Sequence, residues 1–337
     1  MTELSLRVLR HLADGEFHSG AALALALGVT RGTIWNAVRV LDAGGLDVHR
    51  RRGRGYCLSR GLSMLERDAI LRRAGAAAAR LSVEVCDVVD STNTVLMQRA
   101  AAGAPTGSVL AAEHQLSGRG RMGRAWHTNI GGALTFSLLW RFAQGAGGLG
   151  GLSLAAGVAL MRALVQLGAK DTQLKWPNDV VWRGQKVAGM LVELQGDALG
   201  PSTVVIGIGL NIRLSDALVK RIDQPVADLE TVCGRELDRN AVLGAILREL
   251  VPALEQFAES GFAPLRAEWE RCHAHQGCEV TVRLPGGDAQ TGIAHGVADD
   301  GALLFESGNI VRRLHSGEIS LRAGAPSPRS VPVRSRA

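Results

Sequence analysis

Apolar residues in the first sixty positions recur at helical spacing in three short segments. The first segment predicts a helix that ends near Gly15, because glycine commonly follows the last turn of a helix. Ser19 can cap a second helix over 20–27, and Thr30 can cap a third helix over 31–43. Two short helices joined by a turn that contains glycine have the order of a helix-turn-helix.

The third predicted helix separates apolar from polar positions. Ile34, Val38 and Leu41 share one side of this helix and would pack inward. The outward side carries residues that can reach DNA bases or phosphates, namely Arg31, Thr33, Asn36 and Arg39.

The segment after this helix predicts a basic β-hairpin. Two extended runs, 46–52 and 55–58, flank an arginine-rich turn, with Arg50 and Arg52 near its tip. Residues 1–60 carry nine Arg against five Asp and Glu, which gives a net charge of +4. The pattern predicts a winged helix-turn-helix with its wing on phosphates and its third helix in the major groove. A small helical protein-interaction module is the alternative.

Between residues 66 and 272 the apolar pattern changes repeatedly between the periods of strands and helices. Strands are expected over 83–89, 109–114, 133–141, 174–182, 186–193 and 203–212. Helices are expected before residue 80 and over 94–102, 152–167, 240–260 and 265–271. Residues 213–230 are charged and irregular, and we expect a mobile loop there. The region therefore predicts a central mixed β-sheet covered by helices.

Short apolar runs separated by turn residues follow from residue 278 onward. Turns are expected at 285–287, 299–301 and 307–309, and this spacing is typical of a small β-barrel. The last residues are rich in Pro, Ser, Ala and Arg and predict a disordered tail. The fold class is α+β, with a DNA-binding domain over 1–62, a central domain over 66–272, a barrel over 278–322 and a tail over 323–337.

Composition restricts the class of protein. With 337 residues, 46% of them hydrophobic, the chain can bury a large core. Its most apolar stretch, 149–167, is interrupted by Arg162, so no membrane partner is expected. The first residues lack a secretion signal and the five cysteines are scattered, which favours a cytoplasmic protein without a disulfide framework. The Cys and His residues at 272–278 could suggest a zinc cluster, but an interdomain linker is favoured.

One segment of the central region, 118–124, places three arginines among three glycines. Glycines weaken both helices and strands, so this segment predicts a flexible cationic loop between two buried elements. Such a loop can close on an anion and bring guanidinium groups and backbone N–H groups to phosphate or carboxylate oxygens. A contact with nucleic acid or a merely solvated loop explains the segment equally well.

Polar residues also gather at strand ends. The Asp-Ser-Thr-Asn sequence at 90–93 can cap the helix that follows or bind the polar end of a ligand, and capping is favoured from the sequence alone.

Pro177 marks a sheet edge or a bulge, which would place Lys175, Asn178 and Asp179 where they could meet a nucleotide and its metal. A twisted edge strand with surface charges is the alternative.

The Gly-Ile-Gly-Leu-Asn sequence at 207–211 is not a dinucleotide-binding fingerprint. Asn211 stands where a third glycine is required, and no ribose-binding acid is suitably placed. The two glycines do permit a close backbone approach to a ligand.

In combination, these segments resemble the biotin–protein ligase family. The resemblance extends from about residue 4 to 322 and is closest to the bifunctional members, which also repress the biotin operon. The arginine loop and the Lys-Trp-Pro-Asn-Asp sequence at 175–179 are specific as a pair. The resemblance implies a class II synthetase-like catalytic domain that binds biotin and ATP, followed by an SH3-like barrel.

The resemblance also implies a reaction in two steps. The carboxylate of biotin attacks the α-phosphate of ATP, with Mg²⁺ on the triphosphate, and gives biotinyl-5′-AMP and pyrophosphate. A lysine amine of a biotin carboxyl carrier protein, the acetyl-CoA carboxylase subunit, then takes the biotin and releases AMP. The adenylate would act as corepressor, favouring a homodimer on the operator DNA of biotin genes.

The family's site residues are transferred here by position. Contacts to biotin or its adenylate are implied for Ser91, Thr92, Asn93, Gln115, Arg119, Gly120, Arg121 and Lys186. Nucleotide contacts are implied for Gly118, Arg124, Asn178, Asp179 and Asn211. The catalytic residues would be Arg121, Lys186 and Lys175, and DNA contacts would come from Arg31, Thr33, Asn36, Arg39, Arg50 and Arg52. No set of protein ligands to a metal is assigned.

The sequence departs from the family pattern in two places. Met122 stands where the repressor-type loop has another arginine, at a position associated with dimerisation. The segment after Arg213 contains no aromatic residue that could stack on adenine. The alternatives to the bifunctional protein are a ligase with a vestigial helix-turn-helix and a ligand-sensing transcription factor without catalysis. Lipoate-type ligases are the nearest enzymatic alternative.

Overall fold

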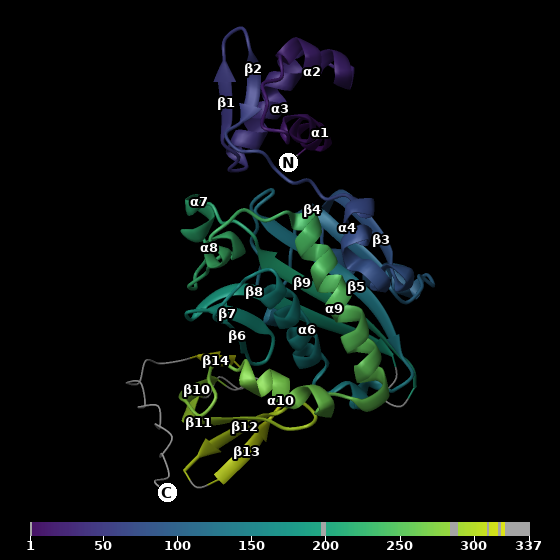
Figure 1. Ribbon diagram of the computed structural model, residues 1–337, viewed down its shortest axis with the longest axis vertical. Helices are drawn as coiled ribbons and strands as arrows, with labels where there is room; N and C mark the ends of the chain where they lie inside the picture. Colours follow the sequence, from purple (N-terminus) through teal and green to yellow (C-terminus); the bar gives the residue numbers. More distant parts are fainter. Residues whose placement is uncertain (1, 197–199, 284–288, 309, 316–317, 321–337) are drawn as a thin grey trace, which may run out of the picture.

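The computed structural model describes residues 2–196, 200–283, 289–308, 310–315 and 318–320. Three units follow one another along the chain. Figure 1 shows a small helical unit at the N-terminal end, a large sheet-and-helix unit in the middle and a small β unit at the other end.

The N-terminal unit is a winged helix-turn-helix, as predicted. Its elements are α1 Glu3–Leu12, α2 Gly20–Leu27, α3 Arg31–Ala43, β1 Val48–Arg51 and β2 Gly55–Leu58. Both predicted caps are present: Ser19 Oγ accepts from Ala22 N and Thr30 Oγ1 accepts from Thr33 N. Gly28, at φ 68°, ends α2 in the left-handed conformation that glycine tolerates best.

The middle unit is built on a mixed seven-stranded sheet in the order β3-β4-β5-β9-β8-β7-β6. The strands are β3 Ser82–Val89, β4 Ser108–Gln115, β5 Ala133–Phe142, β6 Thr172–Lys175, β7 Asp179–Trp182, β8 Gln185–Gly196 and β9 Ser202–Asn211. Only β3 and β4 run parallel, joined by a helical crossover, and every other neighbouring pair is antiparallel. The predicted mixed sheet is therefore confirmed.

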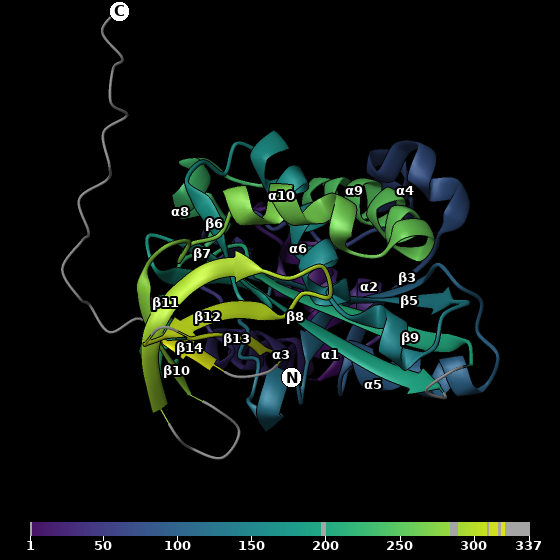
Figure 2. The same cartoon turned by 90° about the horizontal axis from the view of Figure 1, so that it is seen from below.

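Helices cover both faces of this sheet. One face carries α4 Arg67–Ala74, α6 Leu152–Gln166, α9 Arg239–Ser260 and α10 Ala263–Arg271, and the other carries α5 Thr92–Ala101. Figure 2 shows the two layers on opposite sides of the strands. Among the described residues one helical stretch, 146–166, is long and apolar enough to span a membrane, but two thirds of its apolar window is buried in this core.

Two predictions for the middle unit need correction. The single strand expected over 174–182 is wrong, because β6 and β7 form an antiparallel pair with Lys175 opposite Asp179. Pro177 lies in the reversal between them, where its missing N–H costs no ladder hydrogen bond. The expected irregular loop over 213–230 contains α7 Asp216–Val219 and the start of α8 Leu229–Cys233, each capped by a polar side chain.

The C-terminal unit is an antiparallel sheet in the order β13-β12-β11-β10-β14. Its strands are β10 Glu279–Arg283, β11 Ala289–Val297, β12 Leu303–Ser307, β13 Ile310–Leu314 and β14 Glu318–Ser320. A small antiparallel β-sheet unit is therefore confirmed where the small β-barrel was predicted. The expected turn at 285–287, residue 309 of the turn at 307–309 and the tail at 323–337 lie outside the described residues. The segment at 272–278 connects α10 to β10, and Leu174 of β6 exchanges backbone hydrogen bonds with residues 272 and 274.

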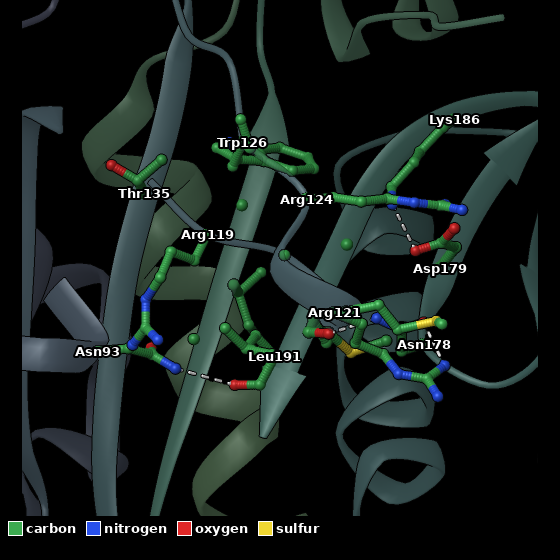
Figure 3. A pocket seen from close by; sticks show the side chains of 18 of the residues that line it. Asn93, Arg119, Arg121, Arg124, Trp126, Thr135, Asn178, Asp179, Lys186 and Leu191 are labelled. Atoms are coloured by element: carbon green, nitrogen blue, oxygen red, sulfur yellow. Dashed lines mark hydrogen bonds and ion pairs between the residues drawn. The ribbon is translucent and has the colours of Figure 1, made fainter. Parts of the chain in front are cut away.

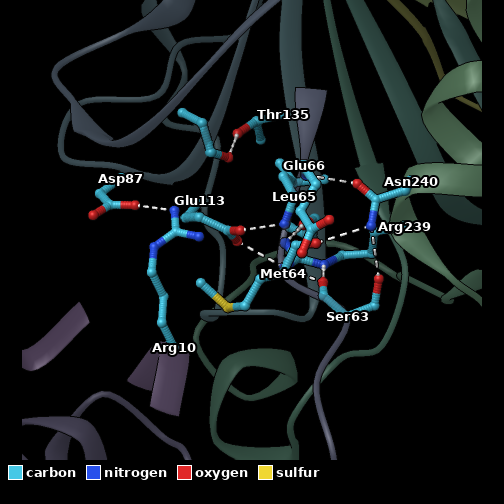
Figure 4. A network of polar contacts seen from close by, with 12 residues as sticks. Arg10, Ser63, Met64, Leu65, Glu66, Asp87, Glu113, Thr135, Arg239 and Asn240 are labelled. Carbon is cyan, nitrogen blue, oxygen red and sulfur yellow. Dashed lines mark hydrogen bonds and ion pairs between the residues drawn. The ribbon is translucent and has the colours of Figure 1, made fainter. Parts of the chain in front are cut away.

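The winged helix-turn-helix contacts the middle unit directly. Ile130 is buried in the apolar core of the N-terminal unit, and Arg10 forms an ion pair with Asp87 of β3. The segment 59–66, which connects β2 to α4, passes a buried ion pair between Arg239 and Glu113. The two side chains join at 2.7 Å and are 1% and 0% exposed (Figure 4). Arg239 also donates to the Ser63 carbonyl.

Candidate functional site

A cavity of about 460 Å³ lies on the central sheet beneath the arginine loop. Residues from segments far apart in the sequence converge on it, as Figure 3 shows. The sequence-predicted residues in its lining are Ser91, Thr92, Asn93, Gln115, Arg119, Gly120, Arg121, Arg124, Lys175, Asn178, Asp179 and Lys186. The structure thus brings all predicted ligand residues together except Gly118 and Asn211.

One end of the cavity is a buried polar pocket at the N-terminus of α5. Thr92 donates to Gln115 Oε1 from its backbone N at 2.8 Å and from its hydroxyl at 3.1 Å. Ser91 Oγ accepts from Thr94 N at 3.5 Å, so the favoured capping role is present while Ser91 also lines the cavity. Ser91, Thr92 and Asn93 are each less than 5% exposed. Buried donors and acceptors in fixed positions can orient the polar part of a small ligand.

The other end is cationic. Lys186 Nζ forms an ion pair with Asp179 Oδ1 at 2.7 Å and lies 5.6 Å from the centre of the Trp126 ring. Arg121 donates to Asn178 Oδ1 at 3.3 Å. Further cations, Arg124 and Lys175, line the same wall. Several cations and a single carboxylate among the described lining residues form a site for an anion.

The arginine loop is a folded turn rather than an extended segment. Gly120 N donates to the Arg124 carbonyl at 2.7 Å, and Trp126 N donates to the Gly118 carbonyl at 2.8 Å. Met122 sits at the tip at φ 57°, with 70% of its surface exposed. The turn directs arginines toward the cavity, and Met122 also lines the cavity while most of its surface stays exposed.

The two glycines of the 207–211 segment are required by side chains. A Cβ on Gly207 would lie 2.1 Å from Asn93 Oδ1, and a Cβ on Gly209 would lie 2.4 Å from the Trp126 ring. Close approach to β9 therefore occurs for these two side chains, and Gly207 and Gly209 also line the cavity. Asn211 is 3% exposed and donates to the carbonyls of Lys186 and residue 227, so it joins β8 to the neighbouring segment.

Several lining residues were not identified from the sequence. Trp126 forms part of the wall, and its buried Nε1 has no hydrogen-bond partner among the described residues. Gln224 comes from the segment expected to be a mobile loop, and Arg283 comes from β10 of the C-terminal unit. An aromatic residue directly after the arginine loop was the available signal for Trp126. No local pattern indicated that Gln224 and Arg283 would line the cavity.

The groove between α3 and the wing is the candidate DNA interface. Arg31 and the wing residues 50–54 line it, together with Trp35, which is 47% exposed and was not predicted. Asn36 and Arg39 are exposed as expected, and the Arg39 guanidinium lies 4.8 Å from the centre of the Trp35 ring. The other predicted contacts have protein partners: Thr33 bonds to Thr30, and Arg50 forms an ion pair with Asp42.

Two histidines lie behind the cationic end, at the junction with the C-terminal unit. Burial lowers the pKa of His273 to about 4, and burial, with smaller effects of His273 and Lys175, lowers the pKa of His275 to about 4. Both residues are 4% exposed. Neutral imidazoles therefore pack in this junction at neutral pH.

Three known families match successive parts of the chain. Residues 5–57 match an HTH domain, residues 85–211 match the Biotin/lipoate A/B protein ligase family, and residues 275–322 match the Biotin protein ligase C terminal domain. These matches coincide with the three units of the fold.

The relatives extend this agreement over almost the whole chain. The bifunctional ligase/repressor BirA of Escherichia coli K12 is 37% identical over 319 residues, covering 94% of this chain and 97% of that protein. The chain belongs to the bifunctional biotin ligase/repressor family. The biotin–[acetyl-CoA-carboxylase] ligase of Mycobacterium tuberculosis is 34% identical over 250 residues, covering 73% of this chain and 91% of that protein.

A solved structure agrees with this family assignment. The biotin protein ligase of Aquifex aeolicus in complex with biotin and ATP superposes with a TM-score of 0.60 at 28% identity, covering 72% of this chain and 99% of that one. The likeness therefore extends to the three-dimensional fold over the part of the chain that the superposition covers.

Proposed function

We propose that this member of the biotin ligase/repressor family joins biotin to ATP as biotinyl-5′-AMP and transfers the biotin to a lysine of a biotin carboxyl carrier protein. The observation that carries the proposal is that one cavity has a buried polar pocket at one end and Lys186 with Arg121 at the other. A carboxylate and a triphosphate that react there would repel each other without such cations.

Each end of the cavity has its own part in the proposal. Ser91, Thr92, Asn93 and Gln115 would hold the ring system of biotin, and Arg119 and Gly120 would cover it. Lys186 and Arg121 would stabilise the charge that develops on the α-phosphate, with Lys175 beside them. Asn178, Asp179 and Arg124 would contact the nucleotide. Substrate and acceptor supply both nucleophiles, so no side chain has to form a covalent bond.

Magnesium would accompany the triphosphate. The residues fit this cation, because Asp179 presents a carboxylate in the cavity wall and Mg²⁺ is commonly held by one or two carboxylates plus substrate phosphates. The cation would offset the negative charge of the leaving pyrophosphate.

The winged helix-turn-helix supports a second role as repressor of biotin genes, with the adenylate as corepressor. Arg31, Asn36, Arg39 and Arg52 would contact operator DNA, and the adenylate-bound protein would act as a homodimer in the cytoplasm. Sedimentation with and without biotin plus ATP tests the dimer: no increase in mass on adding both would contradict it.

Pyrophosphate release tests the ligase. The purified protein with ATP, Mg²⁺ and biotin should release pyrophosphate and form the adenylate, whereas lipoate should give only background release. Addition of a biotin carboxyl carrier domain should then yield AMP and a biotinylated lysine. Release with lipoate but not with biotin would refute the assignment.

The DNA-binding role predicts a specific loss on mutation. Arg31→Ala combined with Arg39→Ala should weaken binding to DNA upstream of biotin genes at least tenfold and reduce the salt slope by about 2, since each phosphate contact contributes about 1. Arg7→Ala is the matched control, because Arg7 is exposed on α1, outside the residues that line the groove. Equal binding by the double variant and the control would instead indicate a vestigial helix-turn-helix.

A further inference from the structure

An exposed tryptophan lies on the outward side of α3, in the groove between this helix and the wing. Trp35 is 47% exposed, and it is not part of the apolar core of the N-terminal unit. That core takes Ile34, Val38 and Leu41 from the opposite side of the same helix. The fold of this unit therefore does not account for a tryptophan at this position.

The groove around Trp35 is strongly cationic. Its described lining residues include five arginines, one from α3 and four from the wing at 50–54, and they include no Asp or Glu. A single exposed apolar side chain carries little weight by itself, but an aromatic ring among five cations fits a nucleic acid, which offers both phosphates and bases. The occupant that this groove suits is therefore DNA.

Two arginines flank Trp35 along the helix. Arg31 and Arg39 lie four residues before and four residues after it, so the three side chains share one side of α3. The Arg39 guanidinium lies 4.8 Å from the centre of the Trp35 ring, and nearly half of Trp35 stays exposed with this contact in place. If the two arginines contact phosphates, the indole ring between them lies at the base edges.

The position of Trp35 within α3 agrees with a contact to bases. In a helix-turn-helix, the N-terminal residues of the recognition helix contact base edges in the major groove. The helix begins at Arg31, which places Trp35 at the start of its second turn. Base edges present hydrogen-bond donors and acceptors in the major groove, and thymine alone adds an apolar group, its C5-methyl. An indole ring has a large apolar surface and one N–H donor, so the methyl group is the partner that uses most of the ring.

We propose that Trp35 is a specificity-determining residue, which recognises a thymine of the bound DNA through contact with its methyl group. The inference rests on the DNA-binding part of the proposed function. It adds to that function the chemical group that α3 distinguishes, because the arginines contact phosphates that every sequence shares.

The test uses the full chain with biotin, ATP and Mg²⁺, and a DNA duplex that the wild-type protein selects from a randomised pool. Each thymine of this duplex is then replaced singly by uracil, which removes only the methyl group. Fluorescence anisotropy measures the Kd of each duplex at several salt concentrations. The variants are Trp35→Ala, Trp35→Phe and a matched control, Leu25→Ala, since Leu25 is 87% exposed on α2 and lies outside the groove lining.

Uracil at one thymine position should weaken wild-type binding about fourfold, the effect of withdrawing one methyl group from an apolar contact. Trp35→Ala should bind the selected duplex about tenfold more weakly than wild type and should bind the thymine and uracil duplexes equally. Its salt slope should equal that of wild type, because the number of cations on phosphates is unchanged. Trp35→Phe should keep part of the preference for thymine, and Leu25→Ala should keep all of it.

The inference is overturned if wild type binds the uracil duplexes as tightly as the thymine duplex at every position. It is also overturned if Trp35→Ala keeps the fourfold preference, or if this variant loses salt slope together with affinity. If Trp35→Ala fails to fold, the wild-type uracil series and Trp35→Phe decide, and a full preference in Trp35→Leu as well as in Trp35→Phe would still support an apolar contact.

Failure of the repressor role gives a different result. If the selected sequence does not occur upstream of biotin genes, the proposed repression of those genes fails, while the uracil comparison still decides whether Trp35 recognises a thymine. If the pool yields no preferred sequence, the protein distinguishes no base and the inference about Trp35 fails.

Discussion

Lys186→Ala is expected to lower kcat for adenylate formation about 100- to 1,000-fold, the effect typical of removing one group that stabilises developing charge. Lys186 Nζ lies 2.7 Å from Asp179 and forms part of the cationic wall. Its loss removes a positive charge from the cavity wall and leaves the Asp179 carboxylate without this partner. Single-turnover formation of biotinyl-5′-AMP measures the step directly.

Two comparisons make this result specific. Lys186→Arg keeps the charge on a differently shaped group and should retain partial activity. Lys220→Ala removes an exposed lysine outside the cavity lining and should behave as wild type. Because Lys186 makes its contacts with the 225–227 segment through backbone atoms, the local fold should survive the alanine substitution. Adenylate formation within threefold of wild type in Lys186→Ala would contradict the proposed role.

Arg239→Ala is expected to reduce the free energy of unfolding of the middle unit by roughly 3–5 kcal/mol, because it leaves a buried carboxylate without its partner. Arg239 donates to Glu113, to the Ser63 carbonyl and to the Ala133 carbonyl, all in the protein interior. Circular dichroism should show a melting temperature lower by about 10 °C for a unit of this size.

Two variants separate the buried charge from other effects of the substitution. Arg248→Ala breaks an exposed contact on the same helix, with the Arg248 side chain 46% exposed, and should cost no more than about 1 kcal/mol. Glu113→Leu combined with Arg239→Met removes both charges and should recover much of the lost stability, as apolar replacements of buried pairs often do. A melting temperature for Arg239→Ala equal to that of Arg248→Ala would show that the pair contributes little.

Local sequence determined the elements of this protein. Ser19 and Thr30 cap helices at the predicted residues because capping needs only a hydroxyl and the backbone three residues away. Apolar periodicity likewise identified most strands of the central sheet, since each buries its side chains against helices that the same pattern predicts. The arginine loop and the segment at 175–179 were recognisable as a pair through the family resemblance, since their residue types alone left other interpretations open.

Tertiary structure decided what these segments do to one another. Gly207 and Gly209 leave room for Asn93 and Trp126 where they line the cavity, and Asn211 joins β8 to the neighbouring segment. Arg283 reaches the cavity only because the C-terminal sheet packs against the middle unit. Pairing between residues far apart depends on close-packed contacts, which leave no periodic trace in the local sequence. For the same reason the local sequence does not predict the hydrogen bonds that Glu193 of β8 accepts from Asn93 and Arg119.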